Sequence, residues 1–253
     1  MTAPIGIQLY SVRDALKEDF EGTLRRLADM GYIGVETANN YGESPESMAR
    51  LLKSLGMRVC GMHCPLPVGD NKNKVLEIAA ALGNKDVICA WMPPERFATR
   101  DGIKTLCDEL NAANENARAQ GLRFSYHNHD FEFTPMADGA LPHEVMRQYL
   151  APTVSFEVDT YWVQAAGGDP AAVVRQLGAR APLLHIKDGP AKRGVPMTAL
   201  GEGVINITQV INAGGAFTEW EIVELDQCAT DIFEAIRTSY KYLIGKGLAH
   251  GAK

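Results

Sequence analysis

Three acidic residues and one histidine follow apolar runs in the second half of the chain. Glu132, Asp159, His185 and Glu224 stand in YHNHDFEF, VSFEVD, LLHIKD and EIVE, at steps of 27, 26 and 39 residues. Each step is about the length of one strand–helix unit. Charges at the ends of buried strands are costly unless they are paired or bound to something. Gathered at one end of a parallel barrel, these residues would form a site for one divalent metal ion. Mainly oxygen donors favour Mn²⁺, Mg²⁺ or Co²⁺, with Zn²⁺ as an alternative.

The elements that must position these residues are eight short apolar runs, which alternate with helical patterns such as Phe20–Met30 and Asp101–Gln120. We expect strands at Ile5–Tyr10, Gly34–Thr37, Arg58–His63, Asp86–Trp91, Arg123–His127, Val154–Asp159, Leu183–Lys187 and Trp220–Glu224. Repeated strand–helix–strand units imply parallel pairing through right-handed crossovers. Eight such units in about 250 residues favour a closed barrel over an open sheet. The sequence therefore predicts one α/β domain over residues 1–253, a single (β/α)8 TIM barrel.

Composition and charge exclude several classes of protein. The net charge is −6 and no cluster of Lys and Arg is present, which argues against a nucleic-acid partner. No stretch approaches about 18 consecutive apolar residues, so no membrane span is expected. The chain opens on IGIQLY without a basic-then-apolar leader. The five scattered cysteines suit a reducing compartment, and we expect a cytoplasmic protein.

The alternation of side chains along a strand selects among the candidates. Glu157 and Asp159 share one face of their strand, and Lys187 shares a face with the histidine of LLHIKD. Glu221 and Glu224 face opposite sides of the last strand, so at most one of them points inward. Glu224 lies nearer the carboxyl end, where barrel chemistry is found, and it is the preferred ligand. Lys187 could pair with a carboxylate or orient an oxyanion.

Other residues near strand ends are candidates for substrate contact. A sugar-like substrate would meet hydrogen-bonding groups and aromatic faces, and we predict such contacts for Gln8, Tyr10, Glu36, His63, His127 and Trp162. Each has a competing interpretation as a satisfied core residue or as packing at the rim of the barrel.

At these motifs the sequence resembles a known family. IGIQLYSVRD, GYIGVE, YHNHDFEF, VDTYWVQAAGGDP, HIKD, LGEG and WEIVELD together are similar to the sugar phosphate isomerase/epimerase family. These are the xylose isomerase-like barrels that also include endonuclease IV and inosose dehydratase. The resemblance implies the metal ligands Glu132, Asp159, His185 and Glu224, the same set that spacing indicates. It also implies that Glu132 and Glu224 act as the acid/base pair, and it suggests a homodimer.

The chemistry expected of such a site is proton abstraction next to a carbonyl, through an enediolate. We therefore expect a metal-dependent isomerase or epimerase that acts on a small sugar or polyol ketone. A lyase or dehydratase that acts on a keto-sugar or inosose by β-elimination is the alternative, since it would use the same intermediate. Epimerases of the family often have His shortly after the sixth-strand Asp, where this chain has Trp162. A non-catalytic sugar-binding barrel is a third hypothesis. An endonuclease is disfavoured because the chain is acidic and has only six histidines.

Overall fold

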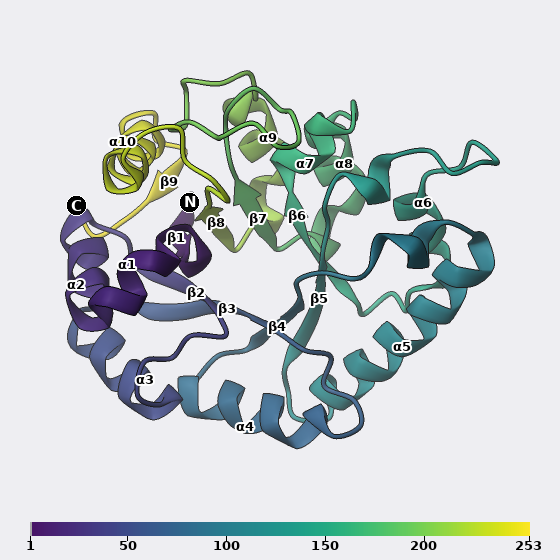
Figure 1. Cartoon of the computed structure of the whole chain (residues 1–253), viewed down its shortest axis with the longest axis horizontal. Coiled ribbons are helices and arrows are strands. Elements are labelled where there is room, and N and C mark those ends of the chain that lie inside the picture. Colours follow the sequence, from purple (N-terminus) through teal and green to yellow (C-terminus); the bar gives the residue numbers. More distant parts are fainter. Residues whose placement is uncertain (1) are drawn as a thin grey trace.

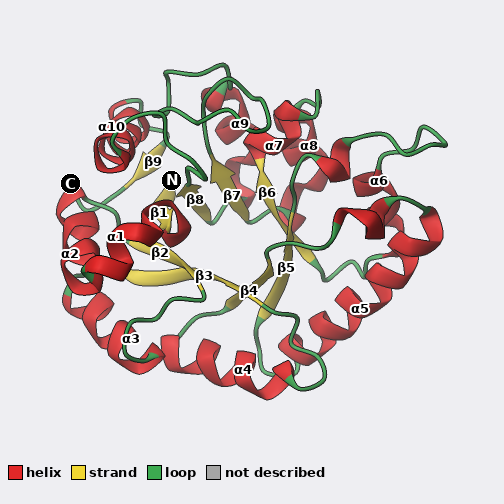
Figure 2. Cartoon of the chain, in the orientation of Figure 1, coloured by secondary structure: helices red, strands yellow, loops and turns green. Residues whose placement is uncertain are grey.

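Eight parallel strands close into a barrel in the computed structural model, and helices cover its outside (Figure 1 and Figure 2). The structure describes residues 2–253. The strands are β1 (Ala3–Gln8), β2 (Gly34–Ala38), β3 (Arg58–Cys64), β4 (Asp86–Cys89), β5 (Arg123–His127), β6 (Ser155–Asp159), β7 (Leu183–Ile186) and β8 (Trp220–Val223). They pair in sequence order, and β1 pairs with both β8 and β2, which closes the ring. The predicted (β/α)8 TIM barrel is confirmed.

Helices connect the strands, and most of them begin after a residue whose side chain caps the first turn. They are α1 (Arg13–Glu18), α2 (Phe20–Met30), α3 (Pro45–Ser54), α4 (Asn71–Leu82), α5 (Arg100–Arg118), α6 (Pro142–Tyr149), α7 (Thr160–Ala165), α8 (Pro170–Leu177), α9 (Ile207–Gly214) and α10 (Ile232–Gly245). The Ser44 hydroxyl accepts a hydrogen bond from the Ser47 N–H at 3.1 Å, so it satisfies a donor that the first turn of α3 leaves free. None of the helices within residues 2–253 combines the length and apolar content that crossing a membrane requires.

Element boundaries differ from the expected ones mainly at the ends of β1 and β4. β1 ends at Gln8, because the Gln8 side chain accepts a hydrogen bond from the Tyr10 N–H at 3.0 Å and starts a 3-10 helix over Leu9–Val12. Tyr10 therefore lies outside the strand. β4 ends at Cys89, so Trp91 lies beyond it as well. A short strand that the sequence did not reveal, β9 (Ala249–His250), pairs with β1 outside the barrel.

An apolar plug fills the barrel toward the amino-terminal ends of its strands. It consists of Cys60, Ile88, Leu183, Trp220 and Ile222. The Trp220 ring fits here because β2 begins with glycine, and a Cβ at Gly34 would lie 2.4 Å from a ring carbon of Trp220.

Above the plug, toward the carboxyl ends, the barrel interior is polar. Inward-facing side chains from six strands are buried here, namely Gln8, Glu36, His63, His127, Glu157 and His185. Strand register sets the position of several of them along the barrel axis. His127 is paired with Glu157, and Asp159 is paired with His185. The chemistry-bearing groups therefore gather at the end of the barrel where the active sites of this fold lie.

Candidate functional site

Three of the four predicted metal ligands lie together at the ends of β6, β7 and β8. One ligand atom each from Asp159, His185 and Glu224 can be chosen so that all three lie within 4.8 Å of one another. His185 Nδ1 is 2.8 Å from Glu224 Oε2. All three side chains are buried. We call Asp159, His185 and Glu224 the outer group.

Lys187 lies in the middle of the outer group's carboxylates. Its Nζ is 2.8 Å from Asp159 Oδ2, 2.6 Å from Glu224 Oε2 and 2.8 Å from Asp226 Oδ2. Burial alone would raise the pKa of Glu224, but Lys187 and His185 lower it below its usual range. The carboxyl of Glu224 is therefore held ionised. Sequence reasoning missed Asp226, which stands two residues beyond Glu224 in the loop after β8.

Glu132 takes a different position. Among the described residues that could bind a metal, Glu132 belongs to no such group. Its Oε1 accepts a hydrogen bond from the Tyr126 hydroxyl at 2.5 Å, and its Oε2 accepts one from the His129 N–H at 2.9 Å. The residue lies in a single 3-10 turn, Phe131–Phe133, that follows β5. Burial raises the pKa of Glu132 to about 8, so the carboxyl is largely protonated at neutral pH.

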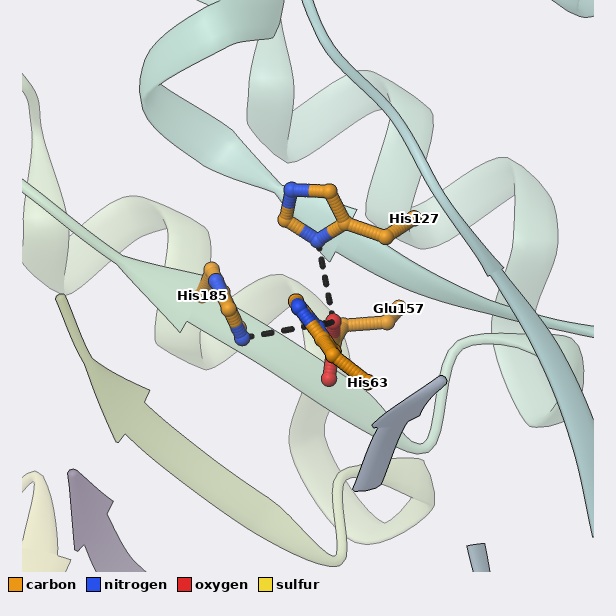
Figure 3. A group of neighbouring side chains, drawn as sticks. All are labelled: His63, His127, Glu157 and His185. Atoms are coloured by element: carbon orange, nitrogen blue, oxygen red, sulfur yellow. Dashed lines mark hydrogen bonds and ion pairs between the residues drawn. The ribbon is translucent and has the colours of Figure 1, made fainter. Parts of the chain in front are cut away.

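A second cluster lies below the outer group and contains most of the polar residues predicted to touch substrate. Figure 3 shows His63, His127 and His185 directed toward the carboxylate of Glu157. Glu157 Oε2 is 2.7 Å from His63 Nε2, 2.9 Å from His127 Nδ1 and 3.3 Å from His185 Nε2. We call these four residues and Glu36 the inner group.

Glu36 and Gln8 complete this buried layer. Glu36 Oε2 is 2.7 Å from His185 Nε2 and 3.1 Å from His63 Nε2, and it accepts a hydrogen bond from the Gln8 amide at 2.5 Å. Burial by itself would lower the pKa of His63, but Glu36 and Glu157 raise it to about 10. Gln8 and Glu36 are fully buried, and Glu36 contacts both His63 and His185.

Sequence reasoning missed the importance of Glu157. The signal was available, because alternation puts Glu157 on the same face as Asp159. The pattern of its own strand could not show which side chains Glu157 would meet, because the histidines that approach it come from β3, β5 and β7.

One aromatic residue, Trp162, stands at the edge of the site. Trp162 is half-buried, with its ring centroid 5.8 Å from Lys187 Nζ and 5.8 Å from the Arg193 guanidinium carbon. Asp159 Oδ1 accepts a hydrogen bond from the Trp162 N–H at 3.0 Å and so fixes the start of α7. Arg193 also forms an ion pair with Asp130. Tyr10 is 44 % exposed, so its ring is open to solvent.

Asp188, the second acid of LLHIKD, has a structural role. Its Oδ1 accepts hydrogen bonds from the N–H groups of Gly189 and Ile205 at 2.8 and 3.1 Å, and its Oδ2 accepts one from Gly201 at 2.8 Å. These bonds tie both ends of the long loop after β7 together. A Cβ at Gly203 would lie 2.1 Å from Asp188 Oδ1, which explains a glycine in LGEG.

Glu221 on β8 and Glu224 just beyond its end lie on opposite sides, as alternation predicts. Glu224 joins the outer group, while Glu221 is buried elsewhere, and its Oε2 has no hydrogen-bond partner within residues 2–253. Burial raises the pKa of Glu221 to about 8.

The donors of the outer group fit a divalent cation. The two outer-group carboxylates, from Asp159 and Glu224, and the neighbouring carboxylate of Asp226 surround the Lys187 ammonium. Asp159 and Glu224 are buried, and a buried carboxylate is costly unless a cation or hydrogen-bond donors balance it. Carboxylate oxygens with one imidazole nitrogen suit Mn²⁺, Mg²⁺ or Co²⁺, and Zn²⁺ is compatible. His185, Asp159 and Glu224 are therefore the residues that could hold the ion.

A large cavity elsewhere lacks this chemistry. It measures about 630 Å³ and is lined by residues of α2, α3 and the loop after β2, among them Phe20, Asn40 and Met48. Its lining contains none of the inner or outer group, so we assign the chemistry to the barrel interior.

With the geometry established, comparisons with known proteins place the chain. A model of the xylose isomerase-like TIM barrel matches residues 24–223, most of the chain. The chain belongs to the xylose isomerase-like TIM barrel family. None of the curated proteins compared with it matches.

Solved structures have the same fold. A sugar phosphate isomerase/epimerase from Parabacteroides distasonis is 24% identical with a TM-score of 0.82, covering 98% of this chain and 100% of that one. A probable 3-DHS dehydratase, AsbF of Bacillus anthracis, is 12% identical with a TM-score of 0.75, covering 95% and 98%. The IOLI protein with a bound zinc atom is 16% identical with a TM-score of 0.72, covering 97% of each chain. At these identities the likeness concerns the fold.

Proposed function

We propose that this xylose isomerase-like barrel is a divalent-metal-dependent isomerase or epimerase of a small sugar or polyol ketone. The observation that carries the proposal is the outer group, Asp159, His185 and Glu224, with the Lys187 ammonium among its carboxylates. The group lies at the carboxyl ends of the strands, where enzymes of this fold bind their substrates. The structural neighbour named sugar phosphate isomerase/epimerase supports the same reaction class.

The side chains of the site supply the proton-transfer chemistry. A bound divalent cation would polarise a substrate carbonyl and stabilise negative charge on it. Glu224 is kept ionised by Lys187 and His185, so its carboxylate can accept the proton next to the carbonyl. The Lys187 ammonium can donate a hydrogen bond to the oxygen on which charge develops. Return of the proton to the neighbouring carbon gives an isomer, and return to the opposite face gives an epimer.

Glu132 is the candidate for the second proton carrier. Its pKa is raised to about 8, whereas that of Glu224 is lowered. Two carboxyls whose environments separate their pKa values are suited to opposite roles, one as acid and one as base. We propose Glu132 as the acid. In the present geometry its carboxyl is held by Tyr126 and His129, so this role requires Glu132 to turn toward the barrel mouth when substrate binds.

A lyase is the second candidate, supported by one observation from a structural neighbour and one from the sequence of this chain. The neighbour from Bacillus anthracis is named a probable dehydratase. Trp162 stands three residues after Asp159, where epimerases of the family often have His. In a lyase the same base would remove the proton, and a β-hydroxyl or β-alkoxyl group would leave.

The experiment that tests the proposal follows the substrate C–H bond. The purified chain is loaded with Mn²⁺, Co²⁺ or Zn²⁺ and incubated in D₂O with ketoses, inososes and 3-keto-glycosides, and products are followed by NMR. An isomerase or epimerase incorporates deuterium and forms an isomer, whereas a lyase forms an unsaturated product. Glu224→Gln should abolish exchange, and Glu77→Gln on the exposed face of α4 should not change it. Absence of exchange with every substrate and metal, together with tight sugar binding, would contradict the enzyme hypothesis and favour a binding protein.

A further inference from the structure

Glu221 is a buried acid at a position that an apolar side chain would ordinarily fill. It lies on β8 between Trp220 and Ile222, whose side chains belong to the plug inside the barrel, so alternation directs Glu221 outward, toward the helices. Its partners in the sheet are Ile5 on β1 and Leu184 on β7, and both are fully buried. Strands of a parallel sheet that is covered on both faces are normally apolar throughout, so an acid here requires an explanation.

The carboxyl of Glu221 lacks a partner that would offset its burial. The residue is 1 % exposed, and its Oε2 has no hydrogen-bond partner within residues 2–253. Burial accounts for the raised pKa of Glu221, and no charged side chain of the described residues contributes to it. A buried polar group without a partner lowers stability. A molecule that supplied a hydrogen-bond donor to Glu221 would therefore be stabilised there.

Glu221 lines a cavity at the amino-terminal end of the barrel, the end opposite to the outer group. The cavity measures about 500 Å³, which is within the range of small-molecule sites. Ile211 and Leu248 are buried beside Glu221 in its lining, whereas Thr2 and Asn212 are exposed at its rim. Among the described residues that line the cavity, Glu221 is the one with an ionisable side chain. The cavity thus has a buried floor that contains an acid and an open, uncharged rim.

Two helices end at this cavity. α9 ends at Gly214 and α10 at Gly245, and the lining includes Asn212 in the last turn of α9 and Gly247 just beyond α10. The carboxyl end of a helix carries a partial negative charge from its free carbonyl groups, which favours a cation nearby. Glu221 and both helix ends therefore favour the same sign of charge in a bound molecule.

The lining suits an organic ammonium group better than a metal ion. A divalent metal ion needs several ligand atoms, and Glu221 supplies the one carboxylate among the described lining residues. An ammonium group needs only hydrogen-bond acceptors, such as a carboxylate and backbone carbonyls. Ile211 and Leu248 provide apolar surface for a short carbon chain, and Thr2 and Asn212 place polar groups at the rim.

We propose that the cavity beside Glu221 is a binding site for a small primary amine, in which the Glu221 carboxylate accepts hydrogen bonds from the ammonium group and the apolar floor holds the carbon chain. The site does not rest on the proposed function, because Glu221 belongs to neither group of possible metal ligands. It also explains an acid on the outward face of β8.

The first test measures binding to the wild-type chain by isothermal titration calorimetry. The probes are n-butylamine and 4-amino-1-butanol, and the neutral and anionic controls are 1-butanol and butyrate. We expect saturable binding of one amine per chain, weaker binding of 1-butanol and no binding of butyrate.

The pH dependence of binding reports on Glu221. Its carboxyl must lose a proton to pair with an ammonium group, whereas an alkylamine stays protonated up to about pH 10. The pKa of Glu221 is about 8, so affinity should rise about tenfold per pH unit from about pH 6 toward that value, with release of a proton on binding. His250 on β9 is exposed, and its Nδ1 is 2.8 Å from the Thr2 carbonyl oxygen. His250→Asn should leave the pH profile unchanged.

Three further variants locate the site. Glu221→Gln keeps the shape of the side chain and removes its charge, so amine binding should weaken at least about tenfold, as loss of a hydrogen bond between charged groups does, and should lose its pH dependence. Ala216→Tyr leaves Glu221 in place and narrows the rim, where Ala216 is exposed, so it should weaken binding as well. Glu77→Gln, at an exposed acid on α4, is the control and should bind like the wild type.

The outcomes decide the inference without reference to metal content or activity. Binding that is specific for amines, rises toward pH 8 and weakens in Glu221→Gln and Ala216→Tyr supports it. Absence of saturable binding of both amines at millimolar concentration overturns it. Equal binding of 1-butanol overturns it too, since the cavity would then not discriminate charge, as does amine binding that is unchanged in Glu221→Gln. The proposed function can fail while this inference holds, and the reverse is also true.

Discussion

Replacing Lys187 by methionine should lower stability and raise metal affinity at the same time. Methionine keeps much of the apolar stem but removes the ammonium from between Asp159, Glu224 and Asp226. Removal of one partner of a buried ion pair costs about 3–5 kcal/mol. For a chain of this size about 1 kcal/mol corresponds to roughly 2–4 °C in Tm, so the metal-free variant should melt roughly 6–20 °C lower.

Metal should reverse that loss. Without the ammonium, nothing repels a divalent cation from the three carboxylates, and two unit charges about 4 Å apart interact by about 4 kcal/mol at an effective dielectric constant near 20. The variant should therefore bind Mn²⁺ more tightly than the wild type, and a ligand at about 100 times its Kd adds about 2.7 kcal/mol of stability. Activity should fall, because the donor to the developing oxyanion is gone.

The assays are differential scanning calorimetry with and without Mn²⁺, and isothermal titration of the metal. Lys192→Met, at an exposed lysine in the following loop, is the control and should change neither result. If the Lys187 variant binds metal more weakly than the wild type, or if metal stabilises both equally, the ammonium does not compete with a cation and the charge argument for the outer group fails.

Three further predictions concern the same side chains. Chelation of bound metal should abolish substrate C–H exchange in D₂O and lower the Tm, and added Mn²⁺ or Co²⁺ should restore both; exchange that persists in metal-free protein would contradict metal dependence. Glu224→Gln should reduce kcat by about 10²- to 10⁴-fold, the range of a general base, with substrate binding less affected, as steady-state kinetics can show. Burial raises the folded-state pKa of Glu221 from 4.5 to about 8, so the folded state binds the extra proton and stability is lost as pH rises from about 4.5 to 8. Glu221→Gln removes this penalty. Between pH 5 and pH 8 the free energy of unfolding of the variant should therefore rise by about 3 kcal/mol relative to that of the wild type, at roughly 1.4 kcal/mol per pH unit. If urea unfolding gives the same pH dependence for both proteins, Glu221 is not buried as an acid.

Local sequence patterns predicted most of the barrel and part of the candidate site. Strand alternation and strand–helix spacing predicted eight parallel strands, and they placed Asp159, His185 and Glu224 at one rim. These inferences hold because the direction of a strand side chain follows from the backbone and from position along the strand. The choice of Glu224 over Glu221 rests on the same property.

Contacts across the barrel and the turns after its strands could not be inferred in this way. Glu36 and His185 are 149 residues apart in sequence and lie 2.7 Å apart, because closure of the ring brings β2 opposite β7. Glu132 lies in a 3-10 turn that directs its carboxyl to Tyr126, and no periodicity describes such a turn. The sequence by itself determined which side chains point into the barrel and at which end they gather. Tertiary structure alone decided which of them meet, because those distances depend on ring closure, strand register and loop path rather than on local pattern.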